Sequence, residues 1–257
     1  MDFFAYTLSG FVVGAIVGIT GVGGGSLMTP LLVLVFGIAP ATAVGTDLLY
    51  AAITKTGGTL VHNLRGSVDW RITGRLAAGS IPAAMLTLYL LALLGPATAS
   101  TSKLISVMLG VALLLTAAVI IFRRQLQTMV AARPQSSERV LTRATVAAGA
   151  ALGVLVSITS VGAGALGVVA LAFLYPKLPA VRIVGSDIAH AVPLTLVAGL
   201  GHWWLGNVDH VLLASLLLGS LPGIYLGSHI ATKVPERMLR PALALMLLAV
   251  GTKLVTH

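Results

Sequence analysis

Six long apolar stretches limit the folds open to this chain more than any other feature of its sequence. Each is close to the roughly 17–25 residues that a helix needs to cross a bilayer. They lie at 40–62, 73–94, 103–122, 183–201, 208–230 and 238–256. In lipid the backbone must satisfy its own hydrogen bonds, which a helix does within one segment. The stretches therefore predict an all-α, polytopic membrane protein.

The composition agrees with lipid as the solvent and excludes a cytosolic enzyme or a disordered tail. Hydrophobic residues make up 57% of the 257 residues and charged residues only 9%, against roughly 25% charged residues in soluble domains. The segment 1–10 has no Lys or Arg ahead of its apolar run, unlike a signal peptide, so we expect it to stay in the membrane. The chain has no cysteine, which excludes disulfides, thiolate nucleophiles and cysteine metal sites.

Two further apolar segments are interrupted by small residues. The segment 3–37 is broken at Gly21–Gly25, and the segment 143–175 is broken around Ser160–Gly164. The part after each break is too short to span the membrane comfortably, so each segment is either a re-entrant helical hairpin or two short tilted helices. The total is then 8–10 membrane helices. Glycine-rich backbone is tolerated at membrane depth only where protein or a polar cavity surrounds it.

The positive charges predict the orientation of the chain. Thirteen of the sixteen Lys and Arg residues lie in loops that can share one side of the membrane, and this side is expected to be cytoplasmic. Both termini are then outside the cell. This distribution accounts for the net charge of +9 without nucleic acid as a partner.

The chain is an internal duplication with an offset of about 140 residues. Val44–Asp47 (VGTD) matches Val184–Asp187 (VGSD), and Gly79–Pro82 matches Gly219–Pro222. The two broken segments match at an offset of 139. We therefore expect a first membrane repeat at 1–124, a cytoplasmic linker at 125–142 and a second membrane repeat at 143–257.

The two repeats differ in the charge of their matching loops. His62–Arg75 contains three arginines, whereas its counterpart His202–Ser215 contains no Lys or Arg. The first loop is thus predicted to be cytoplasmic and the second outside, which gives the repeats inverted topology. Inverted repeats with matched, interrupted helices are typical of alternating-access transporters, whose site lies near the midplane between the repeats.

The two breaks are the predicted substrate site. A helix begins after each break, and its first N–H groups lack partners inside the helix while its dipole favours an anion. Glycine also lets a small ligand approach the backbone. The alternative is close helix packing, which we expect for Gly10, Gly14 and Gly18. The candidate residues are Thr20, Gly21, Val22, Gly23, Gly24, Gly25 and Ser26 in the first repeat, and Thr159, Ser160, Val161, Gly162, Ala163 and Gly164 in the second.

Ionisable residues inside a membrane span cost free energy, so their presence in the predicted spans suggests a functional role. Asp47 and Asp187 are repeat mates, and His190 shares a helix face with Asp187, so these three are candidates for proton coupling. Lys55 is a candidate for attracting the anion. The alternatives are that the aspartates cap or hydrogen-bond a nearby helix end, that Lys55 extends toward the cytoplasmic surface, and that His190 is a buried histidine with its hydrogen bonds satisfied.

No serine elbow, P-loop or metal-ligand motif is present in the sequence. We therefore expect neither an enzyme nor a bound metal or cofactor, and no ATP-driven mechanism.

Three motifs together resemble the TauE/SafE sulfite exporter family, also called TSUP. They are Gly21-x-Gly23-Gly24-Gly25-Ser26-Leu27-x-x-Pro30, Ala43-x-Gly45-Thr46 and His62-x-x-x-Gly66-x-Val68-Asp69-Trp70-Arg71. The resemblance covers nearly the whole chain and implies a polytopic bacterial transporter of sulfite or of organosulfur anions such as sulfoacetate or thiosulfate. Many members read Gly-Thr-Ser where this chain reads Gly45-Thr46-Asp47, a departure compatible with a different coupling ion.

The sequence thus predicts a secondary transporter of a small anion in the bacterial inner membrane, with sulfite, a sulfonate or thiosulfate as substrate and protons as a candidate coupling ion. Membrane lipid is the other expected partner, and the sequence leaves the oligomeric state open. Two alternatives remain, a passive anion channel and a membrane scaffold or sensor that transports nothing.

Overall fold

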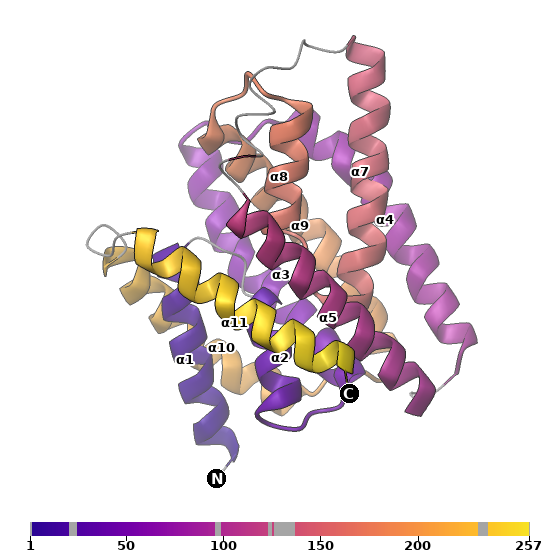
Figure 1. Ribbon diagram of the computed structural model, residues 1–257, viewed down its shortest axis with the longest axis vertical. Helices are drawn as coiled ribbons and strands as arrows, with labels where there is room; N and C mark the ends of the chain where they lie inside the picture. The colour runs from indigo at the N-terminus through magenta and orange to yellow at the C-terminus, as the bar shows by residue number, and fades with distance from the viewer. Residues whose placement is uncertain are drawn as a thin grey trace.

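A computed structural model describes residues 2–20, 25–95, 99–122, 125, 137–230 and 236–256. All regular secondary structure in these residues is helical, as the apolar stretches predict (Figure 1). The helices are α1 (Asp2–Thr20), α2 (Gly25–Leu34), α3 (Pro40–Leu64), α4 (Trp70–Leu93), α5 (Ala99–Ile121), α7 (Glu138–Thr159), α8 (Ala165–Leu174), α9 (Ala180–Trp204), α10 (His210–Ile230) and α11 (Glu236–Thr256).

Several of these helices are long and apolar enough to cross a membrane. Among the described residues, five meet that description, namely 70–93, 102–121, 138–159, 180–204 and 210–227. Their outward faces carry apolar side chains, as lipid requires: Leu86 of α4 is 59% exposed and Leu218 of α10 is 61% exposed. Trp204, at the end of α9, is 84% exposed, where an aromatic belt would place it. The chain is a polytopic membrane protein.

The two broken segments each consist of a long helix followed by a short one. α1 and α7 have 19 and 22 residues, whereas α2 and α8 have 10 each. Ten residues of helix are about 15 Å long, half the roughly 30 Å of hydrocarbon in a bilayer. The N-termini of α2 and α8 can therefore lie at mid-membrane while their C-termini reach a surface.

Glycines bring α1 close to α10 and α4 close to α7. A Cβ on Gly10 would lie 2.4 Å from the carbonyl oxygen of Leu216, and one on Gly14 would lie 2.6 Å from that of Ser220. The same contacts occur between the repeat mates of these residues, since Gly149 packs on Leu76 and Gly153 on Ser80. The expected close packing at Gly10 and Gly14 is confirmed, and van der Waals contact of this kind stabilises helices in lipid.

The contact between α3 and α9 shows that the two repeats are inverted. These helices are repeat mates, and they run antiparallel. Gly45, near the start of α3, lies against Asn207, which follows α9, and Gly185, near the start of α9, lies against Ser67, which follows α3. Because equivalent helices point in opposite directions, the inverted topology predicted from the loop charges is the one that the chain adopts.

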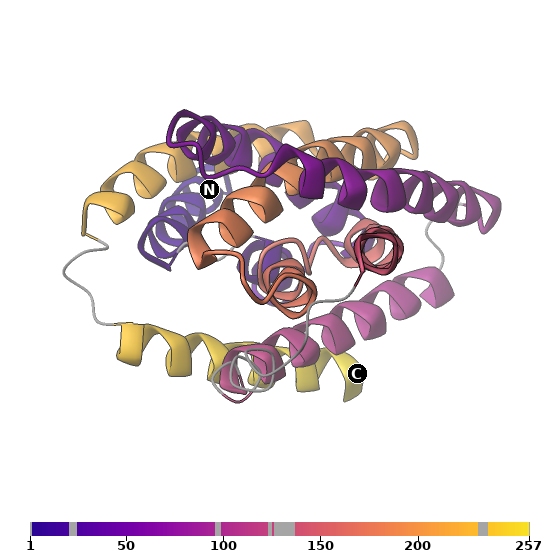
Figure 2. The same cartoon turned by 90° about the horizontal axis from the view of Figure 1, so that it is seen from above.

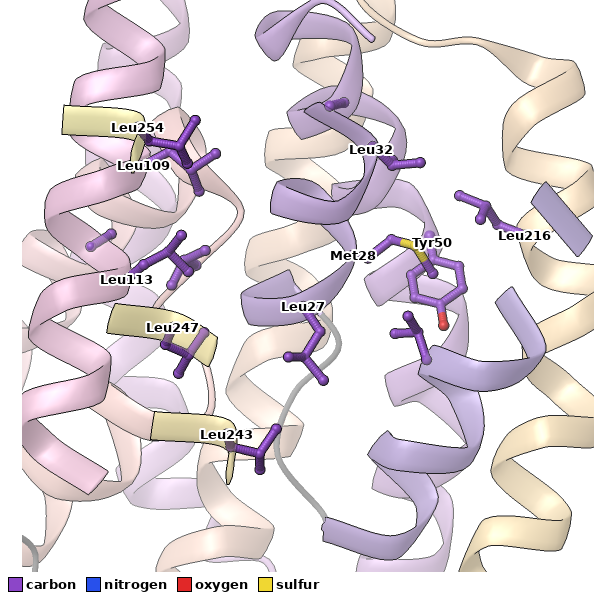
Figure 3. Close-up of a cluster of buried hydrophobic side chains, with 14 of the residues drawn as sticks. Leu27, Met28, Leu32, Tyr50, Leu109, Leu113, Leu216, Leu243, Leu247 and Leu254 are labelled. Carbon is purple, nitrogen blue, oxygen red and sulfur yellow. The ribbon is translucent and has the colours of Figure 1, made fainter. Parts of the chain in front are cut away.

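α5 and α11 are also repeat mates, and they cross as an outer layer of the molecule (Figures 1 and 2). Behind them, α2 lies inside the largest apolar cluster. Figure 3 shows Leu27, Met28 and Leu32 of α2 between leucines of the outer layer on one side and Tyr50 and Leu216 on the other. The outer-layer leucines are Leu109 and Leu113 of α5, and Leu243, Leu247 and Leu254 of α11. The short helix is therefore buried by both repeats.

Candidate functional site

A group of buried and partly buried polar side chains lies where α3 and α9 meet the breaks. We call it the central polar cluster, and it consists of Thr29, Asp47, Lys55, Ser160, Asp187 and His190. Asp47, Asp187 and His190 are each 0% exposed. Burying ionisable groups in a membrane protein costs free energy, so this cluster is the candidate functional site.

The matching tetrapeptides VGTD and VGSD position the two aspartates. In α3, the Thr46 hydroxyl accepts a hydrogen bond from the Asp209 N–H at 3.1 Å. In α9, the Ser186 hydroxyl accepts one from the Asp69 N–H at 2.8 Å. Each motif therefore ties the start of its helix to the loop that follows its repeat mate, and the next residue, Asp47 or Asp187, is buried beyond it.

Asp47 is held by the first broken segment. The Thr29 hydroxyl of α2 donates to Asp47 Oδ2 at 2.5 Å. The other carboxylate oxygen, Oδ1, has no hydrogen-bond partner among the described residues. The Ser160 hydroxyl and the Lys55 ammonium are close enough to act on this carboxylate electrostatically.

Asp187 is packed against the start of α8, and the structure describes no side-chain hydrogen bond to it like the one from Thr29 to Asp47. A Cβ on Gly167 would lie 1.8 Å from Asp187 Oδ1, so only glycine leaves room for the carboxylate there. Within the described part of the chain, neither carboxylate oxygen has a hydrogen-bond partner of normal geometry. The groups that act on Asp187 are the Lys55 ammonium and the backbone N–H of Gly164.

Lys55 joins the two repeats. Its Nζ donates to the carbonyl oxygen of Ala163 at 2.9 Å, across 108 residues of sequence. The same ammonium acts on both Asp187 and Asp47. It is therefore held at the second break, where it acts on both carboxylates, and the side chain is partly buried.

The second break has a backbone that few residues can adopt. Ser160 has a φ of 58°, Gly162 of 122° and Gly164 of 132°, a region in which glycine is strongly favoured. α7 ends at Thr159 and α8 begins at Ala165, so the predicted break is confirmed. The Thr159 hydroxyl accepts a hydrogen bond from the Val161 N–H at 3.1 Å, whereas the buried Ser160 hydroxyl has no partner among the described residues.

The first break is only partly described. α1 ends at Thr20 and α2 begins with Gly25 and Ser26, as expected. Gly21, Val22, Gly23 and Gly24 lie outside the described residues. The structure thus places the second half of the predicted anion site, together with Lys55, Asp47 and Asp187.

His190 faces a different partner. Its Nε2 is 2.8 Å from the Ser80 hydroxyl of α4, and its Nδ1 has no partner in the described part of the chain. The repeat mate of His190 is Tyr50, which is close enough to Ser220, the mate of Ser80, for the two hydroxyls to interact. The two repeats thus bring matching residues together, but one pair contains a histidine and the other a tyrosine.

Sequence reasoning missed three residues that the structure places in or against the cluster. Thr29 belongs to it, Ser80 contacts His190, and Gly167 contacts Asp187. The motif Gly79-Ser80-Ile81-Pro82, repeated at Gly219–Pro222, was a signal for Ser80. No comparable signal marked Thr29 or Gly167. Among the described residues, no group of three or more His, Asp or Glu side chains converges as metal ligands would.

Inverted repeats with paired half-length helices and a buried ionic cluster between them define a class, the membrane transport proteins. Comparison with known proteins agrees. The sequence model of the family described as "Sulfite exporter TauE/SafE" matches residues 6–254. The chain belongs to this family.

Curated relatives carry the same general description. "Probable membrane transporter protein YjnA" of Bacillus subtilis is 40% identical over 253 residues, covering 96% of this chain and 98% of the relative. "Probable membrane transporter protein YdhB" of the same organism is 30% identical over 239 residues, covering 91% and 93%. A "Probable membrane transporter protein" of Xylella fastidiosa is 27% identical over 248 residues. No solved structure matches the chain.

Proposed function

We propose that the protein is a secondary transporter that moves a small anion across the bacterial inner membrane by alternating access. The substrate class is sulfite or an organosulfur anion such as a sulfonate or thiosulfate, and protons are the coupling ion. The observation that carries the proposal is the hydrogen bond from Lys55 of one repeat to Ala163 in the break of the other, beside two buried carboxylates. The family description supports the substrate class.

Three features at the second break favour an anion. The ammonium of Lys55 is held there. α8 begins there, and the positive end of its dipole favours negative charge. The buried Ser160 hydroxyl lacks a partner in the described residues and can donate to a ligand oxygen. α2 begins in the same way at Gly25, and with Thr20, Ser26 and the residues of the first break it would contribute the other side of the site.

Alternating access needs a site between two bodies that can rock against each other. The cluster is built on the antiparallel mates α3 and α9, and glycines let α1 pack closely against α10 and α4 against α7. Asp47, Asp187 and His190 supply groups that can take up and release protons during that motion.

The orientation is part of the proposal. Arg71 and Arg75 of α4 lie within ion-pair distance of Glu138 of α7, and Arg182 of α9 lies near Asp69. These basic residues therefore share one end of the molecule, which we assign to the cytoplasm by the positive-inside rule. Since the chain lacks cysteine, single cysteines test this directly. We expect Arg65→Cys to resist a membrane-impermeant maleimide in intact cells and Leu205→Cys to react; the reverse pattern would contradict the orientation.

The function is tested by flux of sulfite into proteoliposomes of the purified protein, with and without a pH gradient. Sulfate, thiosulfate and a sulfonate serve as competitors. We expect sulfite flux that rises with the proton gradient and is inhibited by the organosulfur anions. Flux that does not depend on the pH gradient would contradict proton coupling and favour a passive channel. Transport of a competitor but not of sulfite would overturn the substrate, and no flux of any anion from folded protein would leave a scaffold or sensor.

A further inference from the structure

The carboxylate of Asp187 occupies the place where the proposed substrate would bind. It lies against Gly167, in the first turn of α8, and the Gly164 N–H and the Lys55 ammonium act on it. These are the groups that would attract an anion. Asp187 is fully buried, and neither of its oxygens has a hydrogen-bond partner of normal geometry in the described residues. A charged carboxylate and an anionic ligand would therefore compete for the Lys55 ammonium and the Gly164 N–H.

The charged neighbours of Asp187 are few. α3 contributes Lys55 and, through Lys55, Asp47. α4 contributes the neutral Ser80, which is bonded to His190 on the same helix as Asp187. α8 has no ionisable side chain, and those of α7 are confined to its first turns, far from the break.

The net charge of Asp47, Lys55 and Asp187 limits when an anion can bind beside them. Two carboxylates and one ammonium leave a net charge of minus one when all are ionised and His190 is neutral. Binding of a singly charged anion would make the net charge minus two in a water-poor environment, which costs free energy. One proton on Asp187 removes its repulsion of the ligand and restores minus one. A loaded site and an empty site then carry the same charge.

Resting on the proposed function, we propose that Asp187 is a tethered competitor of the substrate at the N-terminus of α8. An anion binds there only when Asp187 takes a proton from solution, one proton for each singly charged anion. Release of the anion lets Asp187 ionise and return to Lys55 and the Gly164 N–H, and the proton leaves with the anion. The result is symport through Asp187 rather than Asp47, because Thr29 already holds Asp47 Oδ2.

The test measures proton uptake when purified protein in weak buffer binds methanesulfonate, which keeps one negative charge across the pH range. Where methanesulfonate does not bind, sulfite is used after subtraction of its own buffering. We expect about one proton per bound anion above neutral pH, with affinity falling about tenfold per pH unit where Asp187 is ionised. Asp187→Asn should bind without proton uptake and lose the pH dependence. Its repeat mate Asp47→Asn should keep the proton count even where it weakens binding.

Two results distinguish a failure of this inference from a failure of the proposed function. If the wild type binds an anion and Asp187→Asn takes up as many protons as the wild type, the inference is overturned and the proposed function stands. If the wild type binds none of sulfite, thiosulfate and methanesulfonate at any pH, the proposed function fails and the inference falls with it. Size-exclusion chromatography establishes that each variant is folded, and Asp187→Ser replaces Asp187→Asn if the amide is not tolerated.

Discussion

The two repeats place an aspartate at the same position of the same helix and then surround it differently. Asp47 accepts a hydrogen bond from Thr29 of the short helix in its own repeat. The residue that matches Thr29 at an offset of 139 is Val168, whose side chain has no donor. Asp187 instead lies against Gly167, where the first repeat has Met28. One carboxylate accepts a hydrogen bond from a side chain and the other does not, so the two repeats place matching aspartates in chemically distinct surroundings.

The largest effect is expected at Lys55, whose ammonium acts on both aspartates. Lys55→Met removes the ammonium expected to contact the anion. Loss of one charged hydrogen bond of roughly 1.5–3 kcal/mol should lower anion flux about 10- to 100-fold. Lys55→Arg keeps the charge and is the matched control, with flux partly retained. Initial rates of anion uptake into proteoliposomes measure both. Equal loss in the two variants would show that the shape of lysine, not its charge, is what the site uses.

Gly167 is where the second site is expected to be most sensitive to size. The Cβ of Gly167→Ala would meet Asp187 Oδ1, and overpacking of this kind typically costs about 1–3 kcal/mol. We expect lower thermal stability and a displaced carboxylate, seen as reduced proton uptake on anion binding. Gly57→Ala is the control, because a Cβ there meets nothing within 4 Å. Unchanged stability and proton uptake in Gly167→Ala would contradict the close packing.

Exchanging the residues beside the aspartates tests the difference between the repeats. Thr29→Val leaves Asp47 Oδ2 without its donor and should lower the free energy of unfolding by about 1–3 kcal/mol. Val168→Thr, at the matching position, should lose much less stability. Thermal unfolding of the detergent-solubilised protein compares them. Similar losses in both variants would mean that Asp47 does not depend on Thr29.

The smallest effect is expected at the serines that face His190 and Tyr50. Ser80→Ala removes the 2.8 Å hydrogen bond to His190 Nε2, worth about 0.5–1.5 kcal/mol net. Ser220→Ala should cost less, since the Tyr50 hydroxyl has no partner of normal geometry among the described residues. The same unfolding assay applies, and a larger loss for Ser220→Ala would reverse the comparison.

The sequence predicted the repeats and their inversion because both rest on patterns that the chain carries twice, such as VGTD and VGSD, and on loop charges that differ in number. It predicted the helix break at Ser160–Gly164 because small residues there allow positive φ. It could not predict that Lys55 reaches Ala163, since 108 residues separate them and only the packing of α3 against the second repeat joins them. Nor could it distinguish Asp47 from Asp187, whose local sequences are almost the same; their difference comes from Thr29 and Gly167 on other helices.

Coupling of an anion to protons is tested most directly by imposing an anion gradient and following the lumenal pH of proteoliposomes with a trapped dye. Thiosulfate directed inward should acidify the lumen through wild-type protein, since each anion is expected to enter with protons, and should leave the lumenal pH unchanged through Asp187→Asn while thiosulfate still enters. Thiosulfate entry without acidification through the wild type would contradict proton coupling, and equal acidification through Asp187→Asn would contradict the role given to Asp187.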